Sequence, residues 1–143
     1  MNPGLSYRET SVAGANPVRL VILLYEQAMA DLQRALAAQR LGHIEERTRE
    51  INHALLVIGH LQATIDKEQG GKVAANLERF YEQVKAGLVD AQCRQSASAI
   101  ERQIDYLMQV QQAWRDVERS LHSEPTAAPQ PASDASSSSE WNA

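Results

Sequence analysis

The chain has 143 residues, a formal net charge of −4 and 43% hydrophobic residues, which is ordinary for one soluble domain with appendages. Residues 123–143 carry three of the 18 acidic side chains and no Lys or Arg, so the body is nearly neutral and the tail is acidic. This balance argues against nucleic acid or an anionic membrane as the main partner. No apolar run approaches the roughly 20 residues of a membrane span, and the N-terminus lacks the features of a secretory signal. The single cysteine excludes an intramolecular disulfide and fits a reducing cytoplasm.

The chain begins with a short leader, residues 1–15, whose apolar side chains are Leu5, Tyr7 and Val12. Asn16-Pro17 then predicts a helix start, with Asn as N-cap and Pro at the first helical position, where its missing N–H costs nothing. Pro17 also disfavours helical geometry in the preceding residue. We therefore expect the leader to turn back and pack on the first helix.

Four helices are predicted, over residues 17–41, 43–67, 72–93 and 98–122. Gly42 and the Gly70-Gly71 pair separate the first three helices, and Ser98-Ala-Ile-Glu101 reads as a capping box that opens the fourth. Each helix carries apolar residues at helical spacing. The predicted core includes Leu32 and Leu36 on the first helix, Ile44 and Ile51 on the second, Val73 and Leu88 on the third, and Leu107 and Leu121 on the fourth.

Short connections between long helices make consecutive helices antiparallel neighbours. The predicted fold is therefore all-α, an antiparallel up-down four-helix bundle over residues 16–122. Residues 123–143 are rich in Ser, Ala and Pro, and we expect them to be a disordered tail. Trp141 in this tail is interpreted as incidental rather than as a docking element.

The sequence contains few candidate catalytic or metal-binding residues. Glu50-Ile-Asn-His53 has the ligand spacing of di-iron bundles, but such sites need two of these motifs and two further carboxylates. On a helical wheel His53, His60 and Glu46 fall opposite the apolar face, so we expect them in solvent. Cys93 lies near a helix C-terminus, whereas reactive cysteines favour a helix N-terminus. We therefore expect no enzyme activity, no metal site and no cofactor.

The remaining signal is surplus apolar surface. The segment Val18–Tyr25 contains one polar residue and covers roughly 260° of the helix, far more than a single core requires. Candidate partner-binding residues lie off the core faces: Leu20 and Leu23 on the first helix, Leu56 with the small Gly59 on the second, and Tyr106, Val110, Ala113 and Val117 on the fourth. Two interpretations stay open at this point. The stripes could belong to a wide core or homodimer interface, or they could form grooves that receive apolar helices of a partner.

The landmarks resemble those of the flagellin-specific export chaperone family, FliS, over about residues 5–120. They are Tyr7, the run Asn16-Pro-Val-Arg-Leu-Val-Ile-Leu-Leu-Tyr-Glu-Gln-Ala28, Ile51-Asn-His-Ala54, Leu61-Gln-Ala-Thr-Ile-Asp66, Gly70-Gly-Lys-Val-Ala-Ala-Asn-Leu-Glu-Arg-Phe-Tyr81, Leu88, Ala91 and Ala113-Trp114. The family usually has Asp-Gly where this chain has Glu26-Gln27, and Ala-Asn where it has Ala91-Gln92.

The resemblance implies a non-enzymatic cytosolic chaperone. Such proteins hold the disordered C-terminal segment of flagellin as helices in hydrophobic grooves, prevent premature polymerisation, and aid delivery to a component of the flagellar type III export gate. It also adds Tyr7 and Tyr25 to the expected partner-binding residues. Two further associations stay open: an anti-sigma factor or co-chaperone, and a weak homodimer. The alternative function is a self-associating helical scaffold.

Overall fold

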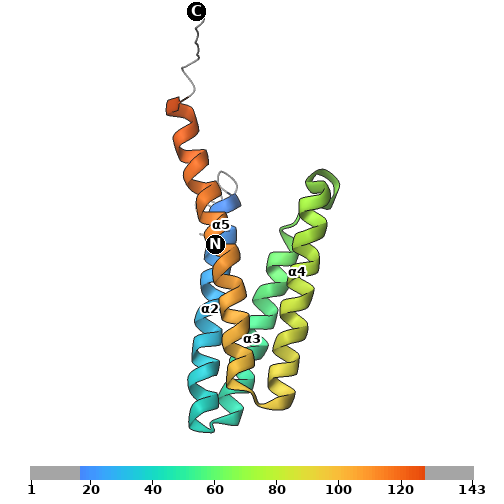
Figure 1. The fold of residues 1–143 in the computed structure, drawn as a ribbon, viewed down its shortest axis with the longest axis vertical. Coiled ribbons are helices and arrows are strands. Elements are labelled where there is room, and N and C mark those ends of the chain that lie inside the picture. The colour runs from blue at the N-terminus through green and yellow to red at the C-terminus, as the bar shows by residue number, and fades with distance from the viewer. Residues whose placement is uncertain (1–16, 128–143) are drawn as a thin grey trace, which may run out of the picture.

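A computed structural model of the protein describes residues 17–127, with side chains through residue 122. This part of the chain forms four helices, α2 (Pro17–Leu41), α3 (Ile44–Ala63), α4 (Lys67–Arg94) and α5 (Ala97–Ala127). Figure 1 shows that they run alternately up and down, which confirms the predicted all-α bundle. The leader and residues 128–143 lie outside the described residues.

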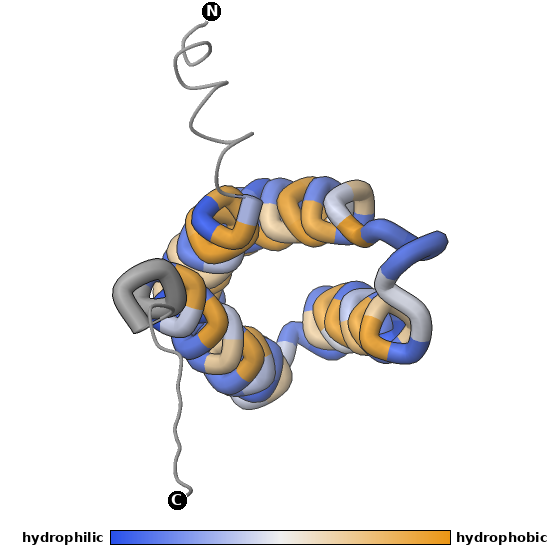
Figure 2. Tube along the Cα trace, turned by 90° about the horizontal axis from the view of Figure 1, so that it is seen from above, coloured by the Kyte–Doolittle hydropathy of each residue, from blue (hydrophilic) through white to orange (hydrophobic). Residues whose placement is uncertain are grey.

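The four helices are arranged in a ring (Figure 2). Helices that follow one another in the chain pack together, and α2 and α5 pack on each other to close the ring. α2 packs most extensively, against α3 on one side and α5 on the other, whereas α4 packs less extensively on its neighbours. The core is made of fully buried aliphatic and aromatic side chains from all four helices, including Tyr25, Leu32, Ile51, Ile58, Leu61, Tyr81, Leu88, Ile100 and Leu107. Apolar burial of this kind is the main stabilising contribution to the bundle.

The predicted boundaries of the first helix are confirmed. α2 begins at Pro17 and ends at Leu41, and Gly42 follows with φ +77°. The amide of Gly42 donates to the Gln39 carbonyl (3.2 Å) and the amide of His43 to the Ala38 carbonyl (2.8 Å). These two bonds form a Schellman motif, which satisfies carbonyls that the end of a helix leaves unpaired.

The predicted break between the second and third helices is wrong in position. α3 ends at Ala63, and Asp66 caps α4 by accepting a hydrogen bond from the Gln69 amide at 3.1 Å. Gly71 lies inside α4 at φ 56°, ψ −129°, a conformation that essentially only glycine adopts, and it kinks the helix there. The Asp66 cap, rather than the glycine pair, therefore marks the start of α4, and the glycine pair marks a kink inside this helix.

The predicted capping box of the last helix is also wrong. α5 begins at Ala97, and Ser96, rather than Ser98, caps it by accepting from the Ala99 amide at 3.1 Å. The preceding residue, Gln95, ends α4 in the left-handed region with φ 52°. The same turn thus ends one helix and caps the next.

Three residues predicted in the core are exposed: Ile44 (52%), Val73 (66%) and Leu121 (45%). All three lie near helix ends, where the neighbouring helices no longer cover them. α5 in addition continues to Ala127, past the predicted boundary at residue 122, so residues 123–127 are helical rather than part of a disordered tail. In the described part of the chain, no helix has the length and apolar character that crossing a membrane requires.

Candidate functional site

The bundle is open at one end. Figure 1 shows the first half of α4 leaning away from α5, at the end where α2 starts and α3 turns into α4. There the side chains surround a cleft of about 260 Å³. It is lined by Pro17, Val18, Leu20 and Val21 of α2, by Thr64, Ile65 and Asp66 of the α3–α4 connection, by Gly70, Val73, Ala74, Leu77 and Tyr81 of α4, and by Trp114 of α5. The lining is almost entirely apolar, with the Asp66 carboxylate among the few polar groups.

Two buried tyrosines lie at the base of this cleft. Tyr25 is 0% exposed and Tyr81 is 1% exposed, and their hydroxyl oxygens are 2.9 Å apart, within hydrogen-bond distance. Desolvation by burial raises the pKa of both hydroxyls above the ordinary value of 10.0. Both hydroxyls are therefore protonated at neutral pH.

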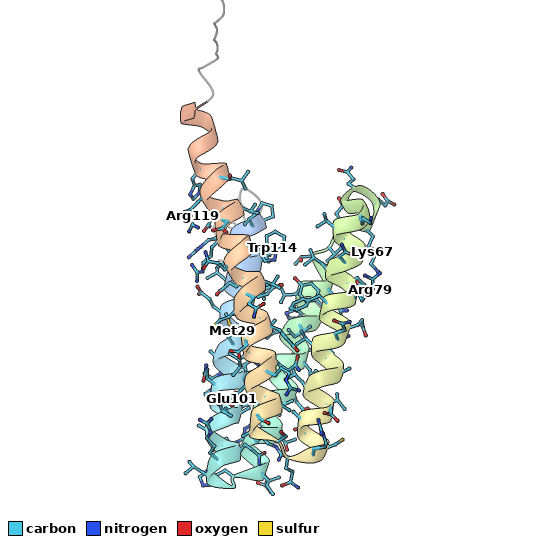
Figure 3. All side chains as sticks on the ribbon, viewed as in Figure 1. Met29, Lys67, Arg79, Glu101, Trp114 and Arg119 are labelled. Carbon is cyan, nitrogen blue, oxygen red and sulfur yellow. The ribbon has the colours of Figure 1, made fainter. Side chains whose placement is uncertain are left out.

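The α5 residues predicted to bind a partner lie beside this cleft. Trp114 lines it, and in Figure 3 its side chain projects from α5 toward the side on which α4 lies. Val110 is half-buried against the core, whereas Tyr106 and Val117 are each 43% exposed and Ala113 is exposed. Helical spacing puts all four on the flank of Trp114, so they extend the apolar surface along α5.

The outer seam between α2 and α5 is polar instead. Arg19 pairs with Glu118 at 3.4 Å and Glu26 with Arg115 at 2.7 Å, and Arg40 and Glu101 form a third pair further along. Such exposed pairs contribute little stability, but they cover this seam with charge. The α5 flank is thereby separated from the outward face of α2.

The outward faces of α2 and α3 carry the other predicted residues. Leu23 is 47% exposed and Leu56 is 58% exposed. A Cβ added to Gly59 would meet no atom within 4 Å, so the predicted notch beside Leu56 is open space. Leu20 is 37% exposed and lines the cleft. The predicted residues thus divide between the cleft with the α5 flank and separate exposed positions on the outward faces of α2 and α3.

Two residues predicted to bind a partner, Tyr25 and Tyr7, are not part of these surfaces. Tyr25 is buried, and it supports the cleft from beneath through Tyr81. Tyr7 falls in the leader, outside the described part of the chain.

A polar network that the sequence did not reveal fastens α2 to α3. The Asp31 carboxylate is 1% exposed and accepts hydrogen bonds from Gln27 (2.9 Å) and Arg34 (2.6 Å). It also lies 2.6 Å from Nδ1 of His53, and Arg34 reaches Glu50 at 3.1 Å. These bonds pair one turn of α2 with one turn of α3 and so fix their register. The only sequence signal was an acidic residue within the apolar arc of the first helix.

The same network refines the placement of His53. His53 is exposed, as predicted, but its ring also lies 2.6 Å from the Asp31 carboxylate across the α2–α3 interface. His60 and Glu46 are exposed as predicted. Across the described residues, no group of three or more His, Cys, Asp or Glu side chains is arranged to hold a metal ion.

Comparison with known proteins now identifies the family. The family model described as flagellar protein FliS matches residues 1–121. The flagellar secretion chaperone FliSB of Pseudomonas aeruginosa is 35% identical over 106 residues, which cover 74% of this chain and 84% of that protein. The flagellar secretion chaperone FliS of Salmonella typhimurium is 30% identical over 110 residues, covering 76% and 82%. The relative of the same name from Vibrio cholerae is 24% identical over 121 residues, covering 82% and 89%. The open-ended helical bundle described above therefore belongs to the FliS family of flagellar secretion chaperones.

Proposed function

We propose that this protein is a cytosolic export chaperone that binds the disordered C-terminal segment of flagellin. In this proposal the segment folds into helices on the apolar surfaces of the bundle, which prevents premature polymerisation. The chaperone then aids delivery of flagellin to the flagellar type III export apparatus. No catalytic step is part of this role.

The apolar cleft at the open end of the bundle is the observation that carries the proposal. A concave, mostly apolar cleft with a few polar groups is the usual form of a binding site. The cleft continues onto Val110, Ala113 and Val117 along α5, in the direction that a helix laid between α4 and α5 would follow. The apolar residues of this flank recur at spacings of three or four, so they form one stripe along which the apolar face of a partner helix can lie.

Coupled folding and binding suits an export chaperone energetically. Folding a disordered segment on a partner buries on the order of 1,000–3,000 Å², and the ordering of that segment costs several kcal/mol of the gross interaction energy. The complex can then be specific and still release its client. Leu23 and Leu56, which are both exposed, offer a long segment further apolar contacts on the outward faces of α2 and α3.

A matched pair of substitutions on α4 tests the proposal. Val73 lines the cleft and is 66% exposed, whereas Val89 is 49% exposed on the same helix outside the cleft. We expect Val73→Asp to weaken binding of a peptide of the flagellin C-terminal helices by at least about tenfold in calorimetry, because it places a charge in an apolar contact. Val89→Asp should change the Kd by less than about twofold.

The same titration, followed by circular dichroism, should show helix content greater than the sum of the separate components. A peptide that does not bind the unmodified protein, or equal losses for Val73→Asp and Val89→Asp, would contradict the proposed function. Melting temperatures of the two variants serve as the folding control.

We further propose that the leader, residues 1–15, covers apolar surface when no client is bound. Its last residue, Ala15, is two positions before Pro17, which itself lines the cleft. Tyr7 is the proposed anchor, because its ring is apolar and its hydroxyl can stay wet at a groove edge. Hydrogen exchange decides the matter: amides of residues 5–12 that exchange at random-coil rates with and without flagellin peptide would exclude a covering role.

Self-association is the alternative function, since apolar stripes can also meet their own copies. Sedimentation velocity of the protein alone separates the two. A stable dimer that dissociates on Val117→Asp or Leu23→Asp would favour a scaffold, and a monomer that forms a defined complex with flagellin would favour the chaperone.

A further inference from the structure

The base of the cleft has one more hydrogen-bond donor than it can satisfy. Tyr25 and Tyr81 each carry one hydroxyl proton. One hydroxyl donates to the other across 2.9 Å, so the proton of the accepting hydroxyl is not used in that bond. Among residues 17–122 no other acceptor bonds to this pair, so the second hydroxyl proton remains without one.

An unsatisfied donor is costly beneath an apolar surface. Both tyrosines are within 1% of complete burial, and the cleft around Tyr81 and Trp114 is lined by aliphatic side chains. A buried donor without a partner loses the hydration it had in the unfolded chain and gains nothing in return. An acceptor that enters the cleft and reaches Tyr81 would therefore gain a hydrogen bond in a low-dielectric site.

The size and charge of the cleft narrow the identity of that acceptor. A volume of about 260 Å³ lies just below the range of pockets that hold drug-sized ligands, so it suits one or two side chains of a partner. Asp66 on the lining disfavours an anion, and the protonated hydroxyls offer a donor rather than a counter-charge. The best match is an apolar group that ends in a neutral oxygen acceptor.

We propose that the cleft is a recognition pocket for a side-chain carboxamide of the partner, with the amide oxygen accepting the free tyrosine proton and the apolar stem packed between Leu77, Val73 and Trp114. This inference deepens the proposed function, because it assigns a specificity determinant to the same surface. Tyr81, with Tyr25 behind it, is the residue that discriminates a carboxamide from an aliphatic group of equal size.

Three small probes of similar shape test the pocket without any flagellin: benzamide, a neutral acceptor; benzoate, an anionic one; and toluene, which has no acceptor. Binding to the full-length ¹⁵N-labelled protein is followed at the Trp114 indole resonance, with the Trp141 indole as an internal control. We expect benzamide to bind about three- to tenfold more tightly than toluene and benzoate, the gain of one hydrogen bond.

The double variant Tyr25→Phe/Tyr81→Phe should bind benzamide and toluene alike, whereas Tyr106→Phe, at an exposed position, should keep the preference. If the double variant does not fold, the order of the three probes on the unmodified protein still decides. Equal binding of benzamide and toluene, or no response of Trp114 to any probe, would overturn the pocket. The pocket would also be overturned if the Trp114 resonance shifted in the Tyr7→Ala variant but did not respond to any probe. That result would mean that the leader occupies the cleft. None of these outcomes depends on whether flagellin binds.

Discussion

The buried tyrosine pair makes the bundle sensitive to alkaline pH in a way that can be calculated. Burial raises the pKa of Tyr25 and Tyr81 in the folded protein, while in the unfolded chain both titrate near 10.0. Above pH 10 the unfolded state therefore holds fewer protons than the folded state, and the free energy of unfolding falls as pH rises. The contribution of the two tyrosines to the free energy of unfolding is therefore fully present below pH 10 and is lost as the pH rises above 10.

The magnitude follows from the titration of the unfolded chain. A tyrosine that stays protonated in the folded state loses about 1 kcal/mol between pH 10 and pH 11, and the loss approaches about 1.4 kcal/mol per pH unit at higher pH. The pair should therefore account for a loss of up to about 2 kcal/mol over that interval.

Urea denaturation at pH 8, 10 and 11 measures this loss. The variant Tyr25→Phe/Tyr81→Phe should lose less stability than the unmodified protein from pH 10 to 11, by the amount just given, because neither ring can ionise. Tyr106→Phe is the matched control, since that ring is exposed in the folded protein. Equal losses in all three proteins would refute the assignment of the buried pair as the source.

Three further substitutions test other parts of the structure. Leu23→Asp should weaken flagellin binding and leave the urea midpoint nearly unchanged, because surface substitutions usually alter stability by less than about 0.5 kcal/mol; an unfolded variant would place Leu23 in the core. Leu32→Ala, at a fully buried position, should cost roughly 2–5 kcal/mol in the same assay, and a cost below about 1 kcal/mol would contradict its burial. Gln95→Gly should raise the free energy of unfolding by about 1 kcal/mol, because Gln95 ends α4 at φ 52°; a loss of stability would show that its side chain makes a contact that outweighs the backbone strain.

The features that sequence predicted well are those set by neighbours along the chain. Pro17 and Gly42 bound α2 because each fixes local backbone geometry, and the helical period placed Leu32, Ile51 and Leu107 in the core. The Gly70-Gly71 pair misled for the same reason: glycine permits a break, but whether the chain breaks there or only kinks depends on the packing of α4.

The candidate site was harder to predict because it depends on how the helices diverge. The surplus apolar surface at the start of α2 pointed to a binding site, but the cleft exists only because α4 leans away from Trp114 of α5. The buried Asp31 likewise needs His53 from another helix, and no pattern within one helix indicates such a partner. The hydroxyl pair of Tyr25 and Tyr81 joins positions 56 residues apart.

The uneven packing of the four helices has a consequence for motion. α2 is held on both sides by extensive contacts, whereas α4 packs less extensively on its neighbours and its first half stands beside the cleft. Local opening should therefore require the least free energy in that half of α4, and its amides should exchange faster than those of α2. A partner that binds between α4 and α5 has to shift only this small local equilibrium. Its arrival would slow exchange in α4 selectively, while the α2–α3 half of the molecule keeps the protection it already has.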